Sequence, residues 1–152
     1  MTYTEIQKRN GNKYYYRVLS VRLGKKITKK RVYLGRDLKE FEIKEKEDNG
    51  DKEILKEKIQ NNVNIIKSKI LDVLKQNNIK KAGIFGSYAR GEQRKNSDID
   101  ILIEPTKEMG FGFFGINDLL EKKLGKKVHL VTYNYIHPHI KKEILNDEIR
   151  II

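Results

Sequence analysis

The clearest hydrophobic pattern in the chain lies in residues 52–76, where apolar side chains recur every three or four positions. They are Ile54, Leu55, Ile59, Val63, Ile66, Ile70, Val73 and Leu74. This spacing predicts one long amphipathic helix with a single buried stripe. The pair Asn77-Asn78 follows and predicts the end of the helix.

After this helix, short apolar runs alternate with helical spacings up to the end of the chain. The pattern predicts strands at 80–85, at about 98–104 and at 127–132, a helix at 115–124 that stops at Gly125, and a last helix that begins at Pro138. Strands interleaved with helices around one sheet indicate an α+β fold, built as an α/β sandwich.

The first part of the chain has a different pattern. Residues 14–23 and 26–34 are rich in aromatic and β-branched side chains and flank Gly24-Lys25, which predicts a β-hairpin. An isolated ribbon of two strands is only marginally stable in water, so we expect the hairpin to dock on another surface. Residues 36–51 are highly charged, contain Asn49-Gly50 and lack a long apolar period, which predicts a short helical piece and a linker. The predicted organisation is therefore a basic hairpin at 1–35, a charged linker at 36–51 and a main domain at 52–152.

The charge of the chain is concentrated in the predicted hairpin. The 152 residues carry a formal net charge of +12, and residues 1–35 contain ten Lys and Arg against Glu5 alone, a net +9. Such a balance favours polyanionic partners, which are nucleic acid, nucleotides or an acidic protein surface.

Two further features of the composition narrow the chemistry and the location. The chain has no cysteine, so a metal would be held by carboxylate, carbonyl or imidazole groups. No apolar run approaches the roughly 18 residues of a membrane span, so we expect a cytoplasmic protein that does not enter a membrane.

Residues 83–103, GIFGSYARGEQRKNSDIDILI, combine a Gly-Ser turn with a pair of aspartates. If 98–104 is a strand, the isoleucines at 99, 101 and 103 face a core, while Asp98 and Asp100 share the other face, about 7 Å apart. Two adjacent carboxylates repel each other unless a cation lies between them. A hard divalent ion such as Mg²⁺, which takes oxygen ligands and completes its shell with substrate phosphates, is the simplest such cation.

The turn at Gly86-Ser87 offers the matching phosphate site. Glycine allows a close approach of the backbone, and the serine hydroxyl and the amides of a starting helix are donors for anions. Each feature alone has an ordinary explanation, because most Gly-Ser turns are only turns and most Asp-x-Asp pairs are solvated strand entrances. Arg90 could likewise simply pair with Glu92. Together, on neighbouring strands, the features predict a site for a nucleoside triphosphate and its metal.

These residues resemble the signature of the minimal nucleotidyltransferases, a branch of the DNA polymerase β-like superfamily. The pattern G-S-x-A-R-G-x(5)-S-D-x-D is matched at every fixed position by residues 86–100. The resemblance covers about residues 52–152 and does not cover the hairpin. It implies the nucleotidyltransferase fold, a twisted mixed sheet flanked by helices.

The resemblance also implies an activity and a partner. Family members transfer a nucleoside monophosphate from a nucleoside triphosphate, typically ATP, to a hydroxyl with the help of Mg²⁺. Many are thought to act as antitoxins that adenylylate a tyrosine of a HEPN-type toxin. Carried over by position, Gly86 and Ser87 would hold the triphosphate, Asp98 and Asp100 would hold the metal, and Arg90 would steady the turn or a phosphate.

One position departs from the family pattern. Family members usually carry a third carboxylate in a segment that reads like K-V-D-L-V, where this chain has Lys127-Val128-His129-Leu130-Val131. Imidazole is a poorer ligand for Mg²⁺ but is acceptable to Mn²⁺, and a neutral His129 could also serve as a general base. The first alternative is a catalytically impaired antitoxin that acts by binding alone. The second is a nucleic-acid-binding module that uses the basic hairpin.

Two other groups of side chains are expected to stay outside the chemistry. His137 and His139 flank Pro138 at a predicted helix start and are interpreted as surface residues. The aromatic run at 111–114 is interpreted as a loop that covers the core, with a lid over the nucleotide as the alternative.

Overall fold

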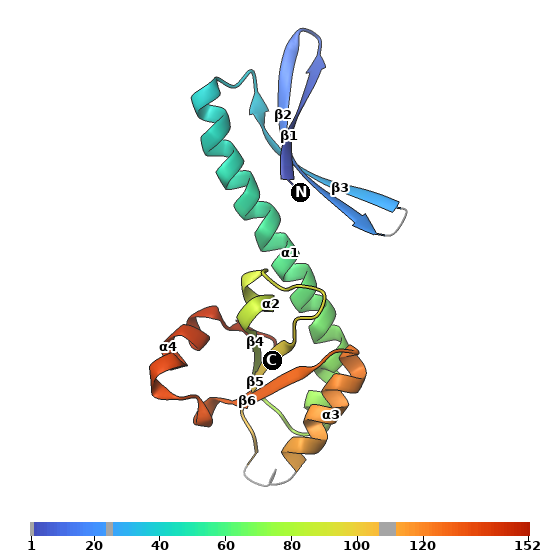
Figure 1. Cartoon of the computed structure of the whole chain (residues 1–152), viewed down its shortest axis with the longest axis vertical. Coiled ribbons are helices and arrows are strands. Elements are labelled where there is room, and N and C mark those ends of the chain that lie inside the picture. The colour runs from blue at the N-terminus through green and yellow to red at the C-terminus, as the bar shows by residue number, and fades with distance from the viewer. Residues whose placement is uncertain (1, 24–25, 107–111) are drawn as a thin grey trace. The chain divides into compact units, whose positions relative to one another are not determined.

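The structure of the chain is a computed structural model that describes residues 2–23, 26–106 and 112–152 (Figure 1). It divides into two compact units, Met1–Lys58 and Ile59–Ile152, each with its own sheet. We call them the N-terminal unit and the C-terminal unit. Helix α1 (Glu40–Gln76) contributes to both. Among the described residues, no helix has the length and apolar character needed to cross a membrane.

The N-terminal unit contains a three-stranded antiparallel sheet in the order β1-β2-β3. Its strands are β1 (Thr2–Arg9), β2 (Asn12–Leu23) and β3 (Lys26–Arg36). The predicted hairpin is present as β2 and β3, and β1, which was not predicted, adds a third strand. The missed signal was the pair Asn10-Gly11, whose φ angles of +48° and +79° are those of a two-residue hairpin turn.

The prediction of a linker at 36–51 is wrong, because α1 already begins at Glu40. Gly50 lies inside this helix and allows it to approach the sheet closely. A Cβ at Gly50 would lie 3.0 Å from Arg17 Cβ and from Leu34 Cδ2. Three of the charged residues that suggested a solvated linker, Lys46, Glu47 and Asp51, instead join the helix to the sheet.

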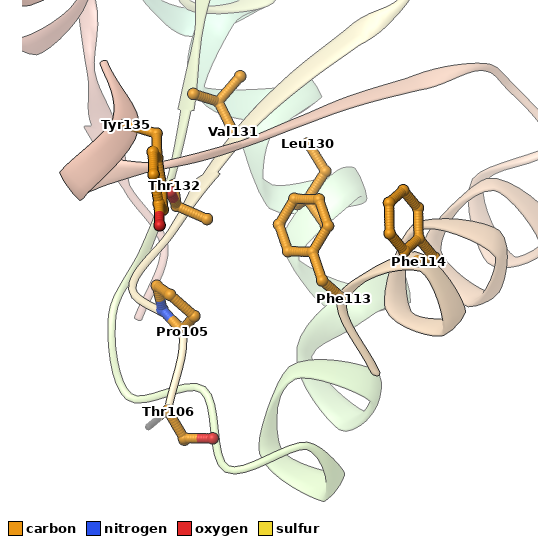
Figure 2. Close-up of a pocket in the computed structure, with 8 residues that line it drawn as sticks. All are labelled: Pro105, Thr106, Phe113, Phe114, Leu130, Val131, Thr132 and Tyr135. Carbon is orange, nitrogen blue, oxygen red and sulfur yellow. The ribbon is translucent and has the colours of Figure 1, made fainter. Parts of the chain in front are cut away.

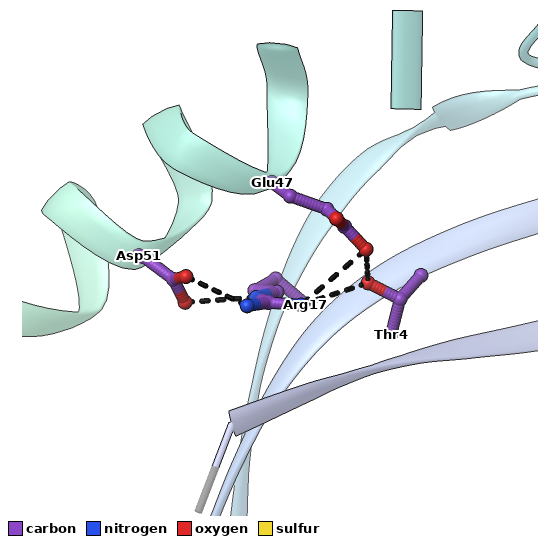
Figure 3. A network of polar contacts seen from close by, with 4 residues as sticks. All are labelled: Thr4, Arg17, Glu47 and Asp51. Carbon is purple, nitrogen blue, oxygen red and sulfur yellow. Dashed lines mark hydrogen bonds and ion pairs between the residues drawn. The ribbon is translucent and has the colours of Figure 1, made fainter. Parts of the chain in front are cut away.

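Arg17 of β2 is the centre of this junction, as Figure 3 shows. Its guanidinium donates hydrogen bonds of 2.8 and 2.7 Å to the two carboxylate oxygens of Asp51, and lies 3.3 Å from Glu47. Thr4 of β1 also donates to Glu47. Lys46 of the helix donates to the carbonyl oxygen of Leu34. Helix α1 therefore packs on one face of this sheet, which we call the inner face, through ion pairs and hydrogen bonds.

The C-terminal unit contains a four-stranded mixed sheet in the order β6-β5-β4-β7. Its strands are β4 (Ala82–Phe85), β5 (Ile99–Ile103), β6 (Val128–Thr132) and β7 (Ile149–Arg150). Strands β5 and β6 are parallel, whereas β4 runs antiparallel to both β5 and β7. The predicted α+β fold with a mixed sheet is confirmed, and the two-residue edge strand β7 was not predicted.

Helices cover both faces of this sheet. They are α1, α2 (Gly86–Arg90), α3 (Gly112–Leu124) and α4 (Pro138–Asp147), with a short 3₁₀ helix η1 (Tyr133–Tyr135). On one face, Ile99, Ile101 and Ile103 join the main core with the stripe of α1 and with α3. On the other face, Phe85 and Leu102 form a second cluster that includes Ile144 of α4. Because strand residues alternate, Asp100 belongs to this second face.

Candidate nucleotide and metal site

Three strands bring the predicted site residues to one end of the sheet. Strand β4 ends at Phe85, and Gly86 begins α2 directly after it. Phe85 is in register with Asp100 on β5, and Asp100 is in register with His129 on β6. Sheet pairing therefore places the glycine turn, one aspartate and the histidine side by side.

Gly86 lies directly against the Asp100 carboxylate. Its φ is +66°, a conformation that side chains with a Cβ rarely adopt. A Cβ at this position would collide with Asp100 Oδ2 and lie 3.1 Å from Asp100 Cγ. Only glycine therefore lets the backbone turn so close to this carboxylate.

Asp100 is half-buried and contacts His129. Its Oδ1 lies 3.3 Å from His129 Nδ1, with 23% of the aspartate side chain and 68% of the histidine side chain exposed. Burial raises the pKa of Asp100 above its ordinary value, and the nearby charge of Asp98 acts in the same direction. The contact with His129 opposes this rise in the pKa of Asp100. No cationic side chain is paired with this carboxylate within the described ranges.

Asp98 precedes the first residue of β5 and is exposed. It makes no hydrogen bond or ion pair with any part of the chain that the structure describes. The residue before it closes a turn: Ser97 Oγ accepts from the amide of Arg94 at 2.8 Å, and the Ser97 amide donates to the Arg94 carbonyl at 3.1 Å. The serine of the S-D-x-D motif therefore shapes the entrance to β5, a role that the sequence analysis did not assign.

Helix α2 is a single short turn that is anchored at both ends. Tyr88 and Ala89 are buried, and the Ser87 carbonyl accepts from the amide of Glu92 at 2.9 Å. Ser87 itself remains partly exposed. The motif thus presents Ser87 beside Gly86 on a turn that is held by the core.

Arg90 is held by two carboxylates. Its guanidinium donates to Glu92 Oε2 at 2.9 Å and to Asp147 Oδ2 at the end of α4, and these contacts raise the pKa of Arg90. Arg90 thus ties the glycine turn to α4. Contact of Arg90 with a phosphate stays a prediction. Asp147 carried no signal in the sequence, because it lies 57 positions away from its partner.

The two aspartates form a donor set that fits a hard divalent cation. No group of three or more His, Cys, Asp or Glu side chains in the described ranges is arranged to hold a metal ion. Asp98 and Asp100 instead offer carboxylate oxygens that no Lys or Arg of the described residues pairs with. Such a pair matches Mg²⁺, which keeps several waters and takes further oxygens from substrate phosphates. The imidazole of His129, in contact with Asp100, adds a donor that Mn²⁺ accepts.

His137 and His139 lie on the surface at the start of α4. Both are exposed, and their rings stack with centroids 5.1 Å apart. The Nδ1 of His137 accepts from the amide of His139 at 3.4 Å, which caps the helix. The contact between the two histidines is therefore explained by the start of α4.

A separate pocket, whose lining residues are shown in Figure 2, contains neither Asp98 nor Asp100 in its lining. It has a volume of about 650 Å³ and is lined by Pro105, Thr106, Phe113, Phe114, Leu130, Val131, Thr132 and Tyr135. Pro105 follows the far end of β5, roughly 16 Å along the strand from Asp100. Of the predicted aromatic run, Phe111 lies outside the described residues, Phe113 packs on the core, and Phe114 is 68% exposed.

Comparison with known proteins identifies the family. The family model described as "Nucleotidyltransferase domain" matches residues 67–151. A relative from Methanocaldococcus jannaschii, named "Putative protein adenylyltransferase MJ0435", is 45% identical over 92 residues, which are 60% of this chain and 99% of the relative. The chain belongs to the minimal nucleotidyltransferase family.

Further comparisons agree with this membership. The "Protein adenylyltransferase MntA" of Thermococcus cleftensis is 32% identical over 74 residues, which are 48% of this chain and 75% of that protein. A solved structure titled "Structure of putative minimal nucleotidyltransferase" matches with a TM-score of 0.50 and 26% identity, over 55% of this chain and 86% of that chain. A second structure, a toxin-antitoxin with AMP-PNP, matches with a TM-score of 0.51 and 24% identity, over 57% and 72% of the two chains, and shows the same fold.

Proposed function

We propose that this minimal nucleotidyltransferase transfers AMP from ATP, with Mg²⁺ or Mn²⁺, to a hydroxyl of a partner protein. The observation that carries the proposal is the approach of the Gly86 backbone to the Asp100 carboxylate, next to Asp98. Within the part of the chain that the structure describes, no Lys or Arg is paired with either aspartate. A bound divalent ion would neutralise this pair and the triphosphate, and so favour attack at the α-phosphorus.

The residues of the chain divide this work between them. Gly86 and Ser87 bind and orient the triphosphate, and Asp98 and Asp100 hold the metal. The acceptor oxygen forms a bond to the α-phosphorus while the bond from that phosphorus to the bridging oxygen breaks, which releases pyrophosphate. His129 accepts the proton of the attacking hydroxyl from its exposed position beside Asp100.

The acceptor is the most specific part of the proposal. The relatives from Methanocaldococcus and Thermococcus are named as protein adenylyltransferases, which supports a protein as acceptor. The family resemblance favours a tyrosine of a HEPN-type toxin, for which this chain would be the cytoplasmic antitoxin.

A second candidate is an antitoxin that binds its partner without transfer. It is favoured by His129, which stands where the family usually has a carboxylate. Both candidates require a protein partner, but only the first requires turnover of ATP.

Calorimetric titration of Mg-ATP and Mn-ATP tests the site. We expect binding to the wild type, and loss of the metal-dependent affinity in the double variant Asp98→Asn, Asp100→Asn, with an unchanged circular dichroism spectrum. Asp118→Asn, an exposed change on α3, is the matched control and should bind as the wild type does. Identical titrations for the wild type and the double variant would disprove the proposed site.

Transfer is measured separately, with ATP labelled at the α-phosphate and the protein encoded by the neighbouring open reading frame as acceptor. Labelling of that protein that disappears in the double variant supports the transferase. Stable complex formation without labelling supports the second candidate.

A further inference from the structure

The outer face of the N-terminal sheet, which points away from α1, combines cations with aromatic rings, of which Tyr33 is exposed and Tyr3 and Tyr16 are partly buried. Thr4, Arg17 and Val32 are in register across the three strands, and the contacts of Arg17 show that this row faces α1. Because strand residues alternate, the neighbouring rows point to the opposite side. These rows contain Tyr3, Glu5, Tyr16, Val18, Arg31 and Tyr33.

The tyrosines of the outer face lie close together and are held in place. The rings of Tyr16 and Tyr33 have centroids 5.4 Å apart, and Tyr33 is 55% exposed. Val18, in register with Tyr3 and Arg31, is fully buried. The hydroxyls of Tyr16 and Tyr33 have no hydrogen-bond partner in the part of the chain that the structure describes.

One cation of this face, Lys29, has no carboxylate partner among the described residues, unlike the cations of the inner face. On the inner face, Arg17 and Lys30 are neutralised by Asp51, Glu47 and Glu57 of α1. On the outer face, Lys29 is exposed and lies 5.8 Å above the ring of Tyr3. Arg31 is also exposed and pairs with Glu5 at 3.2 Å, and Glu5 is the one acidic residue among the first 35.

We infer that the outer face binds a single-stranded polynucleotide. Its bases would stack on Tyr16 and Tyr33, and its phosphates would lie at Lys29 and Arg31. Exposed rings favour a single strand over a duplex, because only unpaired bases offer their faces for stacking. They favour a nucleic acid over an acidic polypeptide, because side-chain carboxylates pair with the cations but cannot stack on the tyrosines.

The test uses the full chain and a fluorescent 20-nucleotide strand of mixed sequence, made as RNA and as DNA, with anisotropy as the readout. Tyr33→Ala should weaken binding roughly five- to 150-fold, the loss expected for one stacked base. Tyr33→Phe keeps the ring and should bind as the wild type does. Tyr135→Ala removes a ring that is 86% exposed in the C-terminal unit, and as the matched control it should change nothing.

A second pair of variants separates the outer face from overall charge. Lys29→Glu should weaken binding and reduce the slope of log affinity against log salt concentration by about 0.7 for each lost phosphate contact. Lys52→Glu, the same change at an exposed position of α1, should leave both quantities close to those of the wild type. The double variant Asp98→Asn, Asp100→Asn should bind the strand normally, so this inference and the proposed transferase activity fail independently.

Tight binding of the RNA strand, the DNA strand or both, lost in Tyr33→Ala and Lys29→Glu, supports the inference. Equal binding by Tyr33→Ala and the wild type overturns it, as does an equal loss in Lys29→Glu and Lys52→Glu. A duplex that binds as tightly as the single strand overturns the stacking mode. If polyglutamate at equal charge concentration competes with the strand, the inference of a nucleic-acid ligand is wrong and an acidic protein is the partner.

Discussion

Both units place two carboxylates beside a sheet, but only one unit neutralises them. In the N-terminal unit, Glu47 and Asp51 of α1 meet Arg17, which holds the pKa of Asp51 below its ordinary value. In the C-terminal unit, Asp98 has no partner among the described residues. Asp100 has His129 as its polar side-chain partner in the described ranges, and burial raises the pKa of Asp100.

The difference separates a structural pair from a functional pair. A carboxylate that is satisfied by a protein cation stabilises the fold and has little capacity left for a ligand. A partly buried carboxylate without a cation costs stability, and a protein keeps it where a ligand supplies the missing charge. The following predictions test this distinction, from the largest expected effect to the smallest.

Asp100→Asn should reduce transfer about 10³-fold or more, because it removes a ligand for the metal that neutralises the triphosphate. The same variant should be more stable than the wild type at pH 7 in the absence of metal. The raised pKa of Asp100 means that ionisation is less favourable in the folded chain, so its cost grows as the pH rises through that pKa. The gain in melting temperature should therefore vanish below about pH 3.5, where both states are protonated.

Transfer is followed with labelled ATP, and stability is followed by thermal unfolding at pH 3 and pH 7. Asp118→Asn on α3 is the control and should change neither quantity. A lower melting temperature of Asp100→Asn at pH 7 would mean that Asp100 is a structural carboxylate like Asp51.

His129→Ala should reduce transfer about 10²-fold, the loss typical of a removed general base. His129→Asp should increase transfer with Mg²⁺, because it adds an oxygen ligand next to Asp100, whereas the wild type should favour Mn²⁺. The three proteins are compared in both metals, with His139→Ala as the control. Equal rates for the wild type and His129→Ala would remove His129 from the chemistry.

Asp51→Asn should lower the free energy of unfolding by about 1 kcal/mol at pH 7, because it breaks the paired hydrogen bonds to Arg17. The pKa of Asp51 is lowered in the folded chain, so its contribution is present above the unfolded value near 3.9 and is lost as the pH falls through the folded value. The difference between variant and wild type should therefore be smaller at low pH than at pH 7.

Urea unfolding monitored by circular dichroism measures this difference. Glu45→Gln, an exposed change on the same helix, is the control and should be neutral at both pH values. A difference that persists unchanged at low pH would show that Asp51 acts through packing and not through its charge.

Asp147→Asn should raise the KM for ATP by up to about fivefold, because it releases Arg90 from α4 and loosens the glycine turn. The turnover number should change less, since Asp147 does not contact the reacting groups. Glu143→Gln, exposed on α4, should leave the KM unchanged. A loss of 10²-fold or more in turnover would instead indicate that Arg90 or Asp147 contacts the substrate directly.

The sequence by itself determined the parts of this protein that depend on neighbouring residues. The spacing of Ile66, Ile70 and Leu74 specified the buried stripe of α1, because a helix brings every third or fourth residue to one side. The alternation of Ile99, Ile101 and Ile103 specified which face of β5 enters the core. The motif from Gly86 to Asp100 specified the family, because its chemistry is encoded within fifteen consecutive positions.

Only the tertiary structure decided the parts that depend on distant partners. Residues 36–51 suggested a short helical piece and a charged linker, but Arg17, more than thirty positions away from Asp51, neutralises Glu47 and Asp51. Gly50 then lets the helix meet the sheet. In the same way, the contact of Asp147 with Arg90 exists only because α4 packs beside α2. A short stretch of sequence shows a charged residue but not its partner. Whether the charge is paired depends on a residue that lies elsewhere in the chain.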